Sequence, residues 1–279
     1  MGFSVKREGI LPGFGLSLGF TVSYLSLIVL IPLAALFLRP FDMGWDKFFA
    51  AVTAPRVLAA YETSFTTAAI ASACSFVLGF VVAWTLVRYR FPWRRFLDAL
   101  VDIPFALPTA VAGIALATLF GPLGWLGAPL TAMGITIINT KAGIVMALIF
   151  IGFPFVVRTV QPVLAELSNE LEEAAHSLGA SRWQTFRRIL FPAVLPALLT
   201  GFTLSFARCI GEYGSVIFIA GNLPMKTEIT PLLIMAKLDQ FDYSGASAIA
   251  IVLLLISFVL LLALNGLQRL GVAGQAAKL

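Results

Sequence analysis

Long stretches without any charged side chain constrain this chain most. Three of them hold no Asp, Glu, Lys or Arg: residues 9–38, 63–87 and 243–268. A helix needs about 20 apolar residues to cross the hydrocarbon core of a bilayer, and each stretch exceeds that length. The chain is 59% hydrophobic and 12% charged, whereas soluble domains are about half apolar and about a quarter charged. The sequence therefore predicts a membrane protein with helical spans.

Three further spans follow from the remaining apolar stretches. Residues 103–140 carry no charge but are too long for one span, and a Gly-Pro pair at 121–122 breaks the stretch. The three additional spans are expected at about 103–120, 142–161 and 193–220. The predicted fold is therefore all-α, a polytopic membrane protein with six transmembrane helices.

The distribution of Lys and Arg sets the orientation of these spans. If the N-terminus is cytoplasmic, the inner segments carry twice as many basic residues as the outer segments. Both termini are therefore expected in the cytoplasm. The same orientation places the long polar loop at residues 162–192 in the cytoplasm.

That loop contains a polar, helix-forming stretch, EAAHSLGASRWQTFRRILFP, at residues 173–192. Asn169 and Glu172 have the spacing of a helix start. An apolar face with i, i+3, i+4 and i+7 spacing follows, formed by Leu171, Ala174, Ala175 and Leu178. Gly179 suits the left-handed position that ends a helix. The acidic side chains expected to point outward are Glu170, Glu172 and Glu173.

A second short helix is expected directly after this turn. Ser181 and Gln184 have the spacing of a capping box, and Pro192 is expected to end the helix. Its apolar side would hold Trp183, Phe186 and Leu190. Two interpretations of this helix-turn-helix remain open. It is either a docking surface for a partner, or an amphipathic loop that lies on its own bundle or on lipid.

The same stretch resembles the loop signature of importer-type ABC permeases. That signature reads E-A-A, three residues, Gly, nine residues, Ile, one residue, Leu, Pro. The matching residues are Glu173, Ala174, Ala175, Gly179, Ile189 and Pro192, with Phe191 in place of Leu. The resemblance implies that this loop, together with Leu178, couples the chain to a cytoplasmic ATPase.

Longer stretches resemble the sulfate/thiosulfate ABC transporter permeases of the CysT type over nearly the whole chain. They include RYRFPWRRFLDALVDIPFALPTAVAG, FPFVVRTVQPVLAEL and LSFARCIGEYGSVIFIAGN. The resemblance implies a type I ABC importer permease in a bacterial inner membrane, with its ABC transmembrane type-1 core at 62–267. Residues 1–61 would then hold the N-terminal tail, the first span and the first outer loop, and residues 268–279 a cytoplasmic tail.

The resemblance also implies the partners and the function. The partners are a second homologous permease in a heterodimer (CysW-like), two copies of a cytoplasmic ABC ATPase and a periplasmic sulfate/thiosulfate-binding protein. The function is ATP-driven import of sulfate or thiosulfate. The sequence has no G-x-x-x-x-G-K-[ST] phosphate loop, so ATP hydrolysis is expected from another chain. We therefore expect a transport subunit rather than an enzyme.

Other functions remain open beside this one. A molybdate or tungstate permease of the same architecture would carry a similar tetrahedral dianion. An ion-coupled secondary anion transporter would need a protonatable group near the midplane, and only Glu212 qualifies. A membrane enzyme would need a catalytic constellation, but the single His176 and the dispersed Cys74 and Cys209 form none. The basic residues are scattered, so membrane lipid rather than nucleic acid is the expected surrounding, and no cofactor is expected.

Two charged residues fall within the expected fifth span. Arg208 and Glu212 are four residues apart and would share a helix face. Intramembrane charges usually face the bundle interior or a water-filled path. Arg208 is therefore a candidate for the anion path, with Glu212 orienting it. The alternative is a self-neutralising pair that pins the span to its neighbours.

The cytoplasmic start of the expected third span combines carboxylates with prolines. Asp98 and Asp102 are expected to form ion pairs with the basic residues of the same loop, namely Arg88, Arg90, Arg94 and Arg95. Pro104 and Pro108 would break or kink the span, because proline lacks a backbone donor. The kink either lines or gates the anion path, or is only a structural bend.

Overall fold

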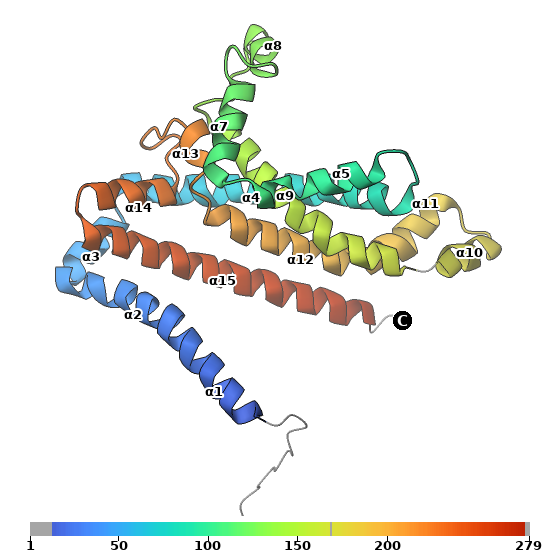
Figure 1. Ribbon diagram of the computed structural model, residues 1–279, viewed down its shortest axis with the longest axis horizontal. Helices are drawn as coiled ribbons and strands as arrows, with labels where there is room; N and C mark the ends of the chain where they lie inside the picture. Colours follow the sequence, from blue (N-terminus) through green and yellow to red (C-terminus); the bar gives the residue numbers. More distant parts are fainter. Residues whose placement is uncertain (1–12, 168, 277–279) are drawn as a thin grey trace, which may run out of the picture.

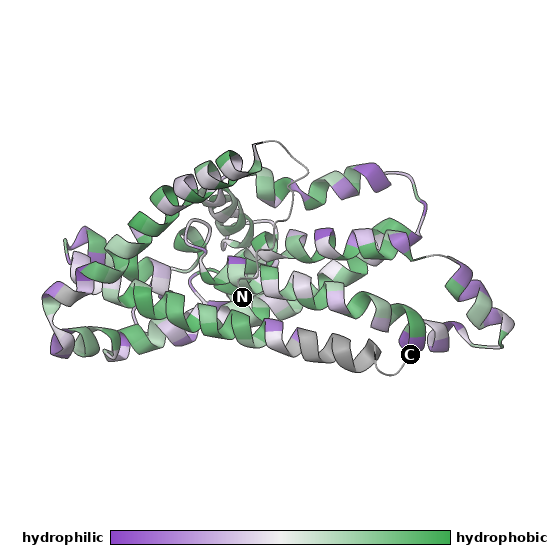
Figure 2. Ribbon diagram, turned by 90° about the horizontal axis from the view of Figure 1, so that it is seen from below, coloured by the Kyte–Doolittle hydropathy of each residue, from purple (hydrophilic) through white to green (hydrophobic). Residues whose placement is uncertain are grey.

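The structure is a computed structural model that describes residues 13–167 and 169–276. Every regular element within those residues is a helix, so the all-α prediction is confirmed. Figure 1 shows the long helices α4, α9, α12 and α15 lying along one common direction, with short helices gathered at both ends. Figure 2 shows hydrophilic residues concentrated toward those two ends and hydrophobic residues between them, which is the pattern of a bilayer-embedded bundle.

Five helices in the described part of the chain are long and apolar enough to cross a membrane. They run over Phe14–Leu38, Pro55–Arg88, Lys141–Glu166, Arg182–Ile210 and Tyr243–Gly266. The corresponding elements are α1 (Phe14–Leu25) with η1 (Ser26–Leu30) and α2 (Ile31–Leu38), α4 (Pro55–Arg88), α9 (Lys141–Glu166), α11 (Arg182–Thr185) with η3 (Phe186–Leu190) and α12 (Phe191–Ile210), and α15 (Tyr243–Ala276). The prediction of a polytopic helical chain is therefore confirmed, with a long helix at five of the six expected spans.

The expected third span is not one continuous helix. The structure has α6 (Ile103–Ala106) and α7 (Thr109–Phe120), with extended backbone at Leu107 between them. Pro104 lies in the first turn of α6, and Pro108 is the N-cap residue of α7. The expected break is therefore present, at Leu107. Pro104 and Pro108 each lie at the start of a helix rather than at a kink within one, because a helix start tolerates a residue without a backbone donor. The twelve residues of α7 span about 18 Å at 1.5 Å per residue, less than the roughly 30 Å of a hydrocarbon core.

Two other expected spans have different bounds. The fourth is longer than expected, since α9 continues to Glu166. The fifth ends earlier than expected, since α12 ends at Ile210 and Gly211 is its C-cap residue. A short helix, α13 (Val216–Ile219), then packs beside α7. In Figure 1, α7 and α8 (Gly127–Ala132) project away from the layer of long helices.

The core forms where α4, α9 and α12 pack against one another. Gly79 of α4 and Gly201 of α12 both lie against Val156 of α9. A Cβ at Gly79 would lie 2.8 Å from the Val156 Cβ, and one at Gly201 would lie 2.9 Å from the Val156 Cα. Small residues at these positions let the helix backbones approach closely, which is how transmembrane helices associate. Buried side chains continue this contact along the bundle, including Ala83, Val157, Val160, Val194 and Leu198.

The short elements define the two ends of the bundle. One end carries η2 (Arg39–Met43), α3 (Trp45–Val52) and α14 (Thr230–Asp239). The other end carries α5 (Arg94–Val101), α10 (Asn169–Ser177) and α11. The polar helix-turn-helix of the sequence therefore lies at the end opposite to α3 and α14 (Figure 1).

Candidate functional site

The loop between α9 and α12 folds as a helix, a turn and a second helix. The first helix, α10, runs over Asn169–Ser177. Gly179 follows with φ +80°, the left-handed conformation that glycine adopts at a helix C-terminus. The turn satisfies the last carbonyls of the helix, since Gly179 N–H donates to the His176 carbonyl (2.9 Å) and Ala180 N–H to the Ala175 carbonyl (3.0 Å). The prediction for this turn is confirmed.

The second helix starts at the predicted capping box. The Ser181 N–H donates to the Gln184 Oε1 (2.8 Å), and the Gln184 N–H donates to the Ser181 Oγ (3.3 Å). The prediction that Pro192 ends this helix is wrong. The chain stays helical from Arg182 to Ile210, with the π-helical turn η3 between α11 and α12. Pro192 lies in the first turn of α12, where its missing donor costs little.

The side chains of α10 divide between a buried contact and an open face. Ala175 is buried, whereas Glu173 and Ala174 are exposed. The Leu178 side chain is 89% exposed and the Leu171 side chain 44% exposed. Ile189 and Pro192 are half-buried at the base of the loop. Most of the apolar face that the sequence predicts therefore points away from this chain's own bundle.

One acidic residue of α10 differs from the expectation that all three point outward. Glu172 pairs with Arg88, the last residue of α4, at 2.6 Å between Oε1 and Nη1. The Arg88 guanidinium also lies 5.4 Å from the centre of the Trp84 ring. Trp84 in turn packs against Phe186 of η3, with ring centroids 5.5 Å apart. The loop is therefore tied to α4 by an ion pair and by aromatic packing.

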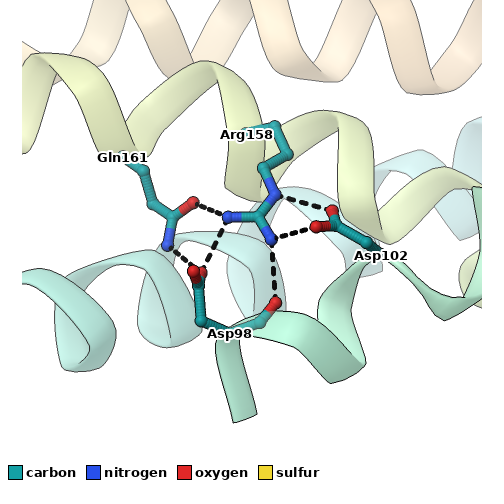
Figure 3. Close-up of polar contacts among 4 residues, drawn as sticks. All are labelled: Asp98, Asp102, Arg158 and Gln161. Atoms are coloured by element: carbon teal, nitrogen blue, oxygen red, sulfur yellow. Dashed lines mark hydrogen bonds and ion pairs between the residues drawn. The ribbon is translucent and has the colours of Figure 1, made fainter. Parts of the chain in front are cut away.

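A second charged cluster joins α5 to α9 at the same end of the bundle (Figure 3). Arg158 of α9 donates to both carboxylate oxygens of Asp102, at 2.7 and 2.6 Å. It also donates to the Asp98 carboxylate (2.7 Å), to the Asp98 carbonyl (2.8 Å) and to the Gln161 Oε1 (2.6 Å). Gln161 closes the ring of contacts by donating to the Asp98 carboxylate (2.9 Å). All guanidinium nitrogens thus have acceptors.

The cluster corrects the predicted partner of the two carboxylates. Ion pairing of Asp98 and Asp102 was expected with arginines of their own loop, but the structure pairs both with Arg158. The hydrogen bond from Gln161, and then Arg158 itself, hold the pKa of Asp98 below its ordinary value. The one available signal was Arg158 itself, a charge placed inside an apolar span, because such charges usually find a partner.

Arg208 and Glu212 form the expected pair, but not on one helix face. The distance between Arg208 Nη1 and Glu212 Oε2 is 2.6 Å, and Glu212 follows the end of α12. Glu212 is 2% exposed and accepts from the Ser215 N–H (2.9 Å) and the Ser215 Oγ (3.0 Å). The Arg208 side chain is 34% exposed. The carboxylate is therefore buried and fully bonded, while the guanidinium reaches the surface of this chain.

The prolines of the third segment lie at different places relative to this pair. Thr109, directly after Pro108, packs against Gly214, so Pro108 lies near the start of the tight contact between α7 and the 213–216 segment. Pro104 belongs to α6, which packs on α9 instead. The structure therefore brings Pro108, but not Pro104, toward the Arg208–Glu212 region.

An ion pair that the sequence reasoning missed lies at the opposite end of α4. Arg56 donates to both carboxylate oxygens of Glu228, at 2.7 and 2.6 Å, and Glu228 is 1% exposed. No local pattern joins residues so far apart in the chain. Among the described residues, no group of His, Cys, Asp and Glu is arranged to hold a metal ion.

The sequence of this helical bundle and its polar loop matches a known family of transport components. Residues 75–272 match the model of the family described as "Binding-protein-dependent transport system inner membrane component". The chain therefore belongs to that family of inner-membrane transport components.

Within the family, the chain is similar to proteins named for sulfate transport. It is 50% identical over 266 residues to the sulfate transport system permease protein CysT of Escherichia coli (strain K12), covering 95% of this chain and 96% of that protein. It is 47% identical to the CysT protein of Synechocystis sp. (strain ATCC 27184 / PCC 6803 / Kazusa), covering 90% of this chain and 88% of that one. These similarities agree with the resemblance that the sequence motifs carry.

Solved structures support the same fold at low sequence identity. A chain of a bacterial ABC transporter that imports the acidic polysaccharide alginate superposes with a TM-score of 0.77 at 16% identity, covering 92% of this chain and 96% of that one. A chain of the MetNI methionine ABC transporter, in an inward-facing conformation, gives a TM-score of 0.59 at 19% identity, covering 77% of this chain and 95% of that one. The fold is therefore that of an ABC importer permease.

Proposed function

We propose that this chain is the permease subunit of an ATP-driven importer that carries sulfate or thiosulfate across the bacterial inner membrane. The observation that carries the proposal is 50% identity across 95% of the chain to a sulfate permease. Identity of that extent covers the membrane bundle as well as the loop. A molybdate or tungstate permease is the rival within the same fold, since those anions are also tetrahedral dianions.

The energy for import would come from a partner chain. The sequence contains no G-x-x-x-x-G-K-[ST] phosphate loop. We propose that two copies of a cytoplasmic ABC ATPase bind this chain and a second, homologous permease. The two permeases together would line the path of the anion, and a periplasmic sulfate/thiosulfate-binding protein would deliver it.

We assign the docking of the ATPase to the α10–α11 loop. Leu171, Ala174 and Leu178 form an apolar strip that this chain leaves open. An amphipathic helix that presents such a strip commonly lies in a groove of a partner protein. Gly179 and the small Ala174 and Ala175 allow the partner backbone to approach closely. This exposure favours docking over the alternative in which the loop lies on its own bundle.

The orientation follows from this assignment. The end with α5, α10 and α11 would face the cytoplasm, together with both termini, and the end with α3 and α14 would face the periplasm. The excess of Lys and Arg in the inner segments supports this orientation. The core at 62–267 would then be the ABC transmembrane type-1 unit, flanked by the segments 1–61 and 268–279.

For the anion path we propose a role for Arg208. Its side chain is one-third exposed, while Glu212 is buried and held by Ser215. A guanidinium fixed in this way can present positive charge without moving. Pro108, at the start of α7, would shape the same region, and Pro104, in the first turn of α6, would set the bend between α5 and α7.

An ion-coupled secondary transporter would use Glu212 differently, as a group that takes up and releases a proton. Glu212 already has three partners in the structure, one of them a guanidinium. Both carboxylate oxygens are therefore held by bonds within this chain, Oε1 by Ser215 and Oε2 by Arg208. This geometry is that of a fixed structural pair and gives proton coupling no separate support.

Site-specific photo-crosslinking tests the docking assignment. A photoreactive amino acid is placed at Leu178 in the assembled complex, and the matched control carries it at Trp125, which is similarly exposed (91% against 89%). Trp125 lies in the turn between α7 and α8, and these two helices are far from α10 (Figure 1). The expected result is a covalent product with the ATPase from Leu178 and none from Trp125. Capture of the ATPase from Trp125, or from neither position in an active complex, would contradict the assignment.

A further inference from the structure

The side chains of the docking loop contact a helix that is not its neighbour in the chain. In sequence, α10 and α11 lie between α9 and α12. However, Glu172 of α10 pairs with Arg88 of α4 at 2.6 Å. Phe186, directly after α11, packs on Trp84 and Phe80 of α4, with ring centroids 5.5 and 6.2 Å apart. Three contacts therefore join the loop to the cytoplasmic end of α4.

The chain segments that connect the loop to α9 and α12 are poorly suited to transmit a displacement of the loop. On one side, α9 contains Pro154 and Pro162 and is followed by Leu167 in an extended conformation. On the other side, the chain passes through the π-helical turn η3 and then through Pro196 in the interior of α12. Prolines and π-turns are the usual sites where helices bend. Movement of the loop would be absorbed in part at these positions.

In contrast, α4 is continuous and firmly held. It runs for 34 residues, and its one proline, Pro55, lies at the first turn, where it does not weaken the helix. Midway, Gly79 lets α4 pack directly on Val156 of α9. A displacement at its cytoplasmic end is therefore carried along the helix.

The outer end of α4 is tied to α14 and to the loop before it. Arg56 holds the buried Glu228 with two hydrogen bonds of 2.7 and 2.6 Å. The Thr230 N–H donates to the Ser64 Oγ at 2.7 Å. These contacts lie at the end of the bundle opposite to α10 (Figure 1). One stiff helix thus joins the docking loop to the outer loop at residues 221–229.

We propose that α4 transmits movement of the docking loop across the membrane, and that Arg88 and Trp84 are the positioning residues that connect the two. The Arg88–Glu172 ion pair and the packing of Trp84 on Phe186 pass the movement of the loop to α4. The Arg56–Glu228 pair passes it to the outer loop. The proposal rests on the proposed function, because it requires an ATPase that moves the α10–α11 loop.

The test separates docking from transmission. The reconstituted complex, with partner permease, ATPase and binding protein, is assayed for labelled sulfate imported per ATP hydrolysed. Arg88→Gln is expected to lower this ratio about fivefold, the low end of the coupling between linked sites, while the ATPase remains bound. The matched control is Arg90→Gln, which removes the same charge from an exposed position two residues away, and its ratio is expected to match the unmodified chain.

A charge exchange and a second position complete the design. The double variant Arg88→Glu with Glu172→Arg is expected to recover part of the ratio that Arg88→Gln loses. Arg56→Gln is expected to abolish the stimulation of ATP hydrolysis by the binding protein, with docking of the ATPase unchanged. Trp84→Leu, which keeps the site apolar, provides a variant if Arg88→Gln does not assemble, and it is also expected to lower the ratio.

The results that overturn each proposal differ. An unchanged ratio in assembled Arg88→Gln or Trp84→Leu complexes would overturn the role of α4, even if crosslinking at Leu178 captures the ATPase. Equal loss in Arg88→Gln and Arg90→Gln would also overturn it, because the effect would then be one of general charge. Failure of the unmodified chain to bind any ATPase through Leu178 would instead overturn the proposed function.

Discussion

Replacement of Gly179 tests whether the shape of the docking loop depends on one backbone conformation. Gly179 has φ +80°, and no heavy atom lies within 4 Å of the position that a Cβ would occupy. Gly179→Ala therefore costs conformational energy without a steric clash inside this chain. An L-residue pays roughly 1–2 kcal/mol to adopt the left-handed conformation. Since about 1.4 kcal/mol corresponds to a tenfold change in an equilibrium constant, the affinity for the ATPase is expected to fall by about five- to thirtyfold.

A second substitution at Gly179 separates backbone conformation from contact with the partner. Asparagine tolerates the left-handed region far better than alanine, although its side chain is larger. If conformation is the cause, Gly179→Asn binds the ATPase more tightly than Gly179→Ala. The assay is titration of labelled ATPase onto the permease complex in lipid nanodiscs. Equal affinity for Gly179→Ala and the unmodified chain, or weaker binding of Gly179→Asn than of Gly179→Ala, would refute the reasoning.

Two further predictions concern the bundle and the anion path. Gly201→Ala is expected to lower the stability of the bundle by about 1–3 kcal/mol, because its Cβ would lie 2.9 Å from the Val156 Cα. The measurement is thermal unfolding in detergent, and the control is Gly211→Ala, whose Cβ meets open space. An equal loss of stability in both variants would contradict the packing account. Arg208→Gln is expected to destabilise the chain by about 3 kcal/mol, the low end for loss of one partner of a buried pair, since it leaves the buried Glu212 without its cation while Arg208 itself is one-third exposed. Adding Glu212→Gln is expected to restore stability but not sulfate uptake, and restored uptake would show that the pair serves packing alone.

The features that the sequence predicts best are those that depend on neighbouring residues. Charge-free stretches locate three of the five long helices because the cost of burying a charge in lipid acts on each segment separately. The capping box of Ser181 and Gln184 and the left-handed turn at Gly179 also involve residues a few positions apart. Such local rules hold whatever the rest of the chain does.

Proline was harder to interpret from the sequence. Pro192 was expected to end a helix, and Pro104 and Pro108 to break or kink one. The break is present at Leu107, but Pro104 and Pro192 lie in the first turn of a helix and Pro108 directly precedes one. A proline ends one helix or starts the next with the same local chemistry. The choice depends on the packing of the surrounding segments, which the local sequence does not contain.

The ion pairs of the candidate site depend on the tertiary structure. Arg158 meets Asp98 across 60 positions of the chain, and Arg56 meets Glu228 across 172 positions. Sequence spacing carries no information at these separations. The sequence therefore predicts correctly that Asp98 forms an ion pair, but it predicts the wrong arginine as the partner.

Uptake of labelled sulfate tests the central claim most directly. The complex of this chain with its partner permease and ATPase is reconstituted into liposomes, supplied with the binding protein, and assayed with and without ATP and with excess unlabelled molybdate. We expect uptake that requires ATP and the binding protein and that persists in the presence of molybdate. Entry of labelled molybdate without any sulfate uptake, or sulfate uptake that proceeds without ATP, would contradict the account.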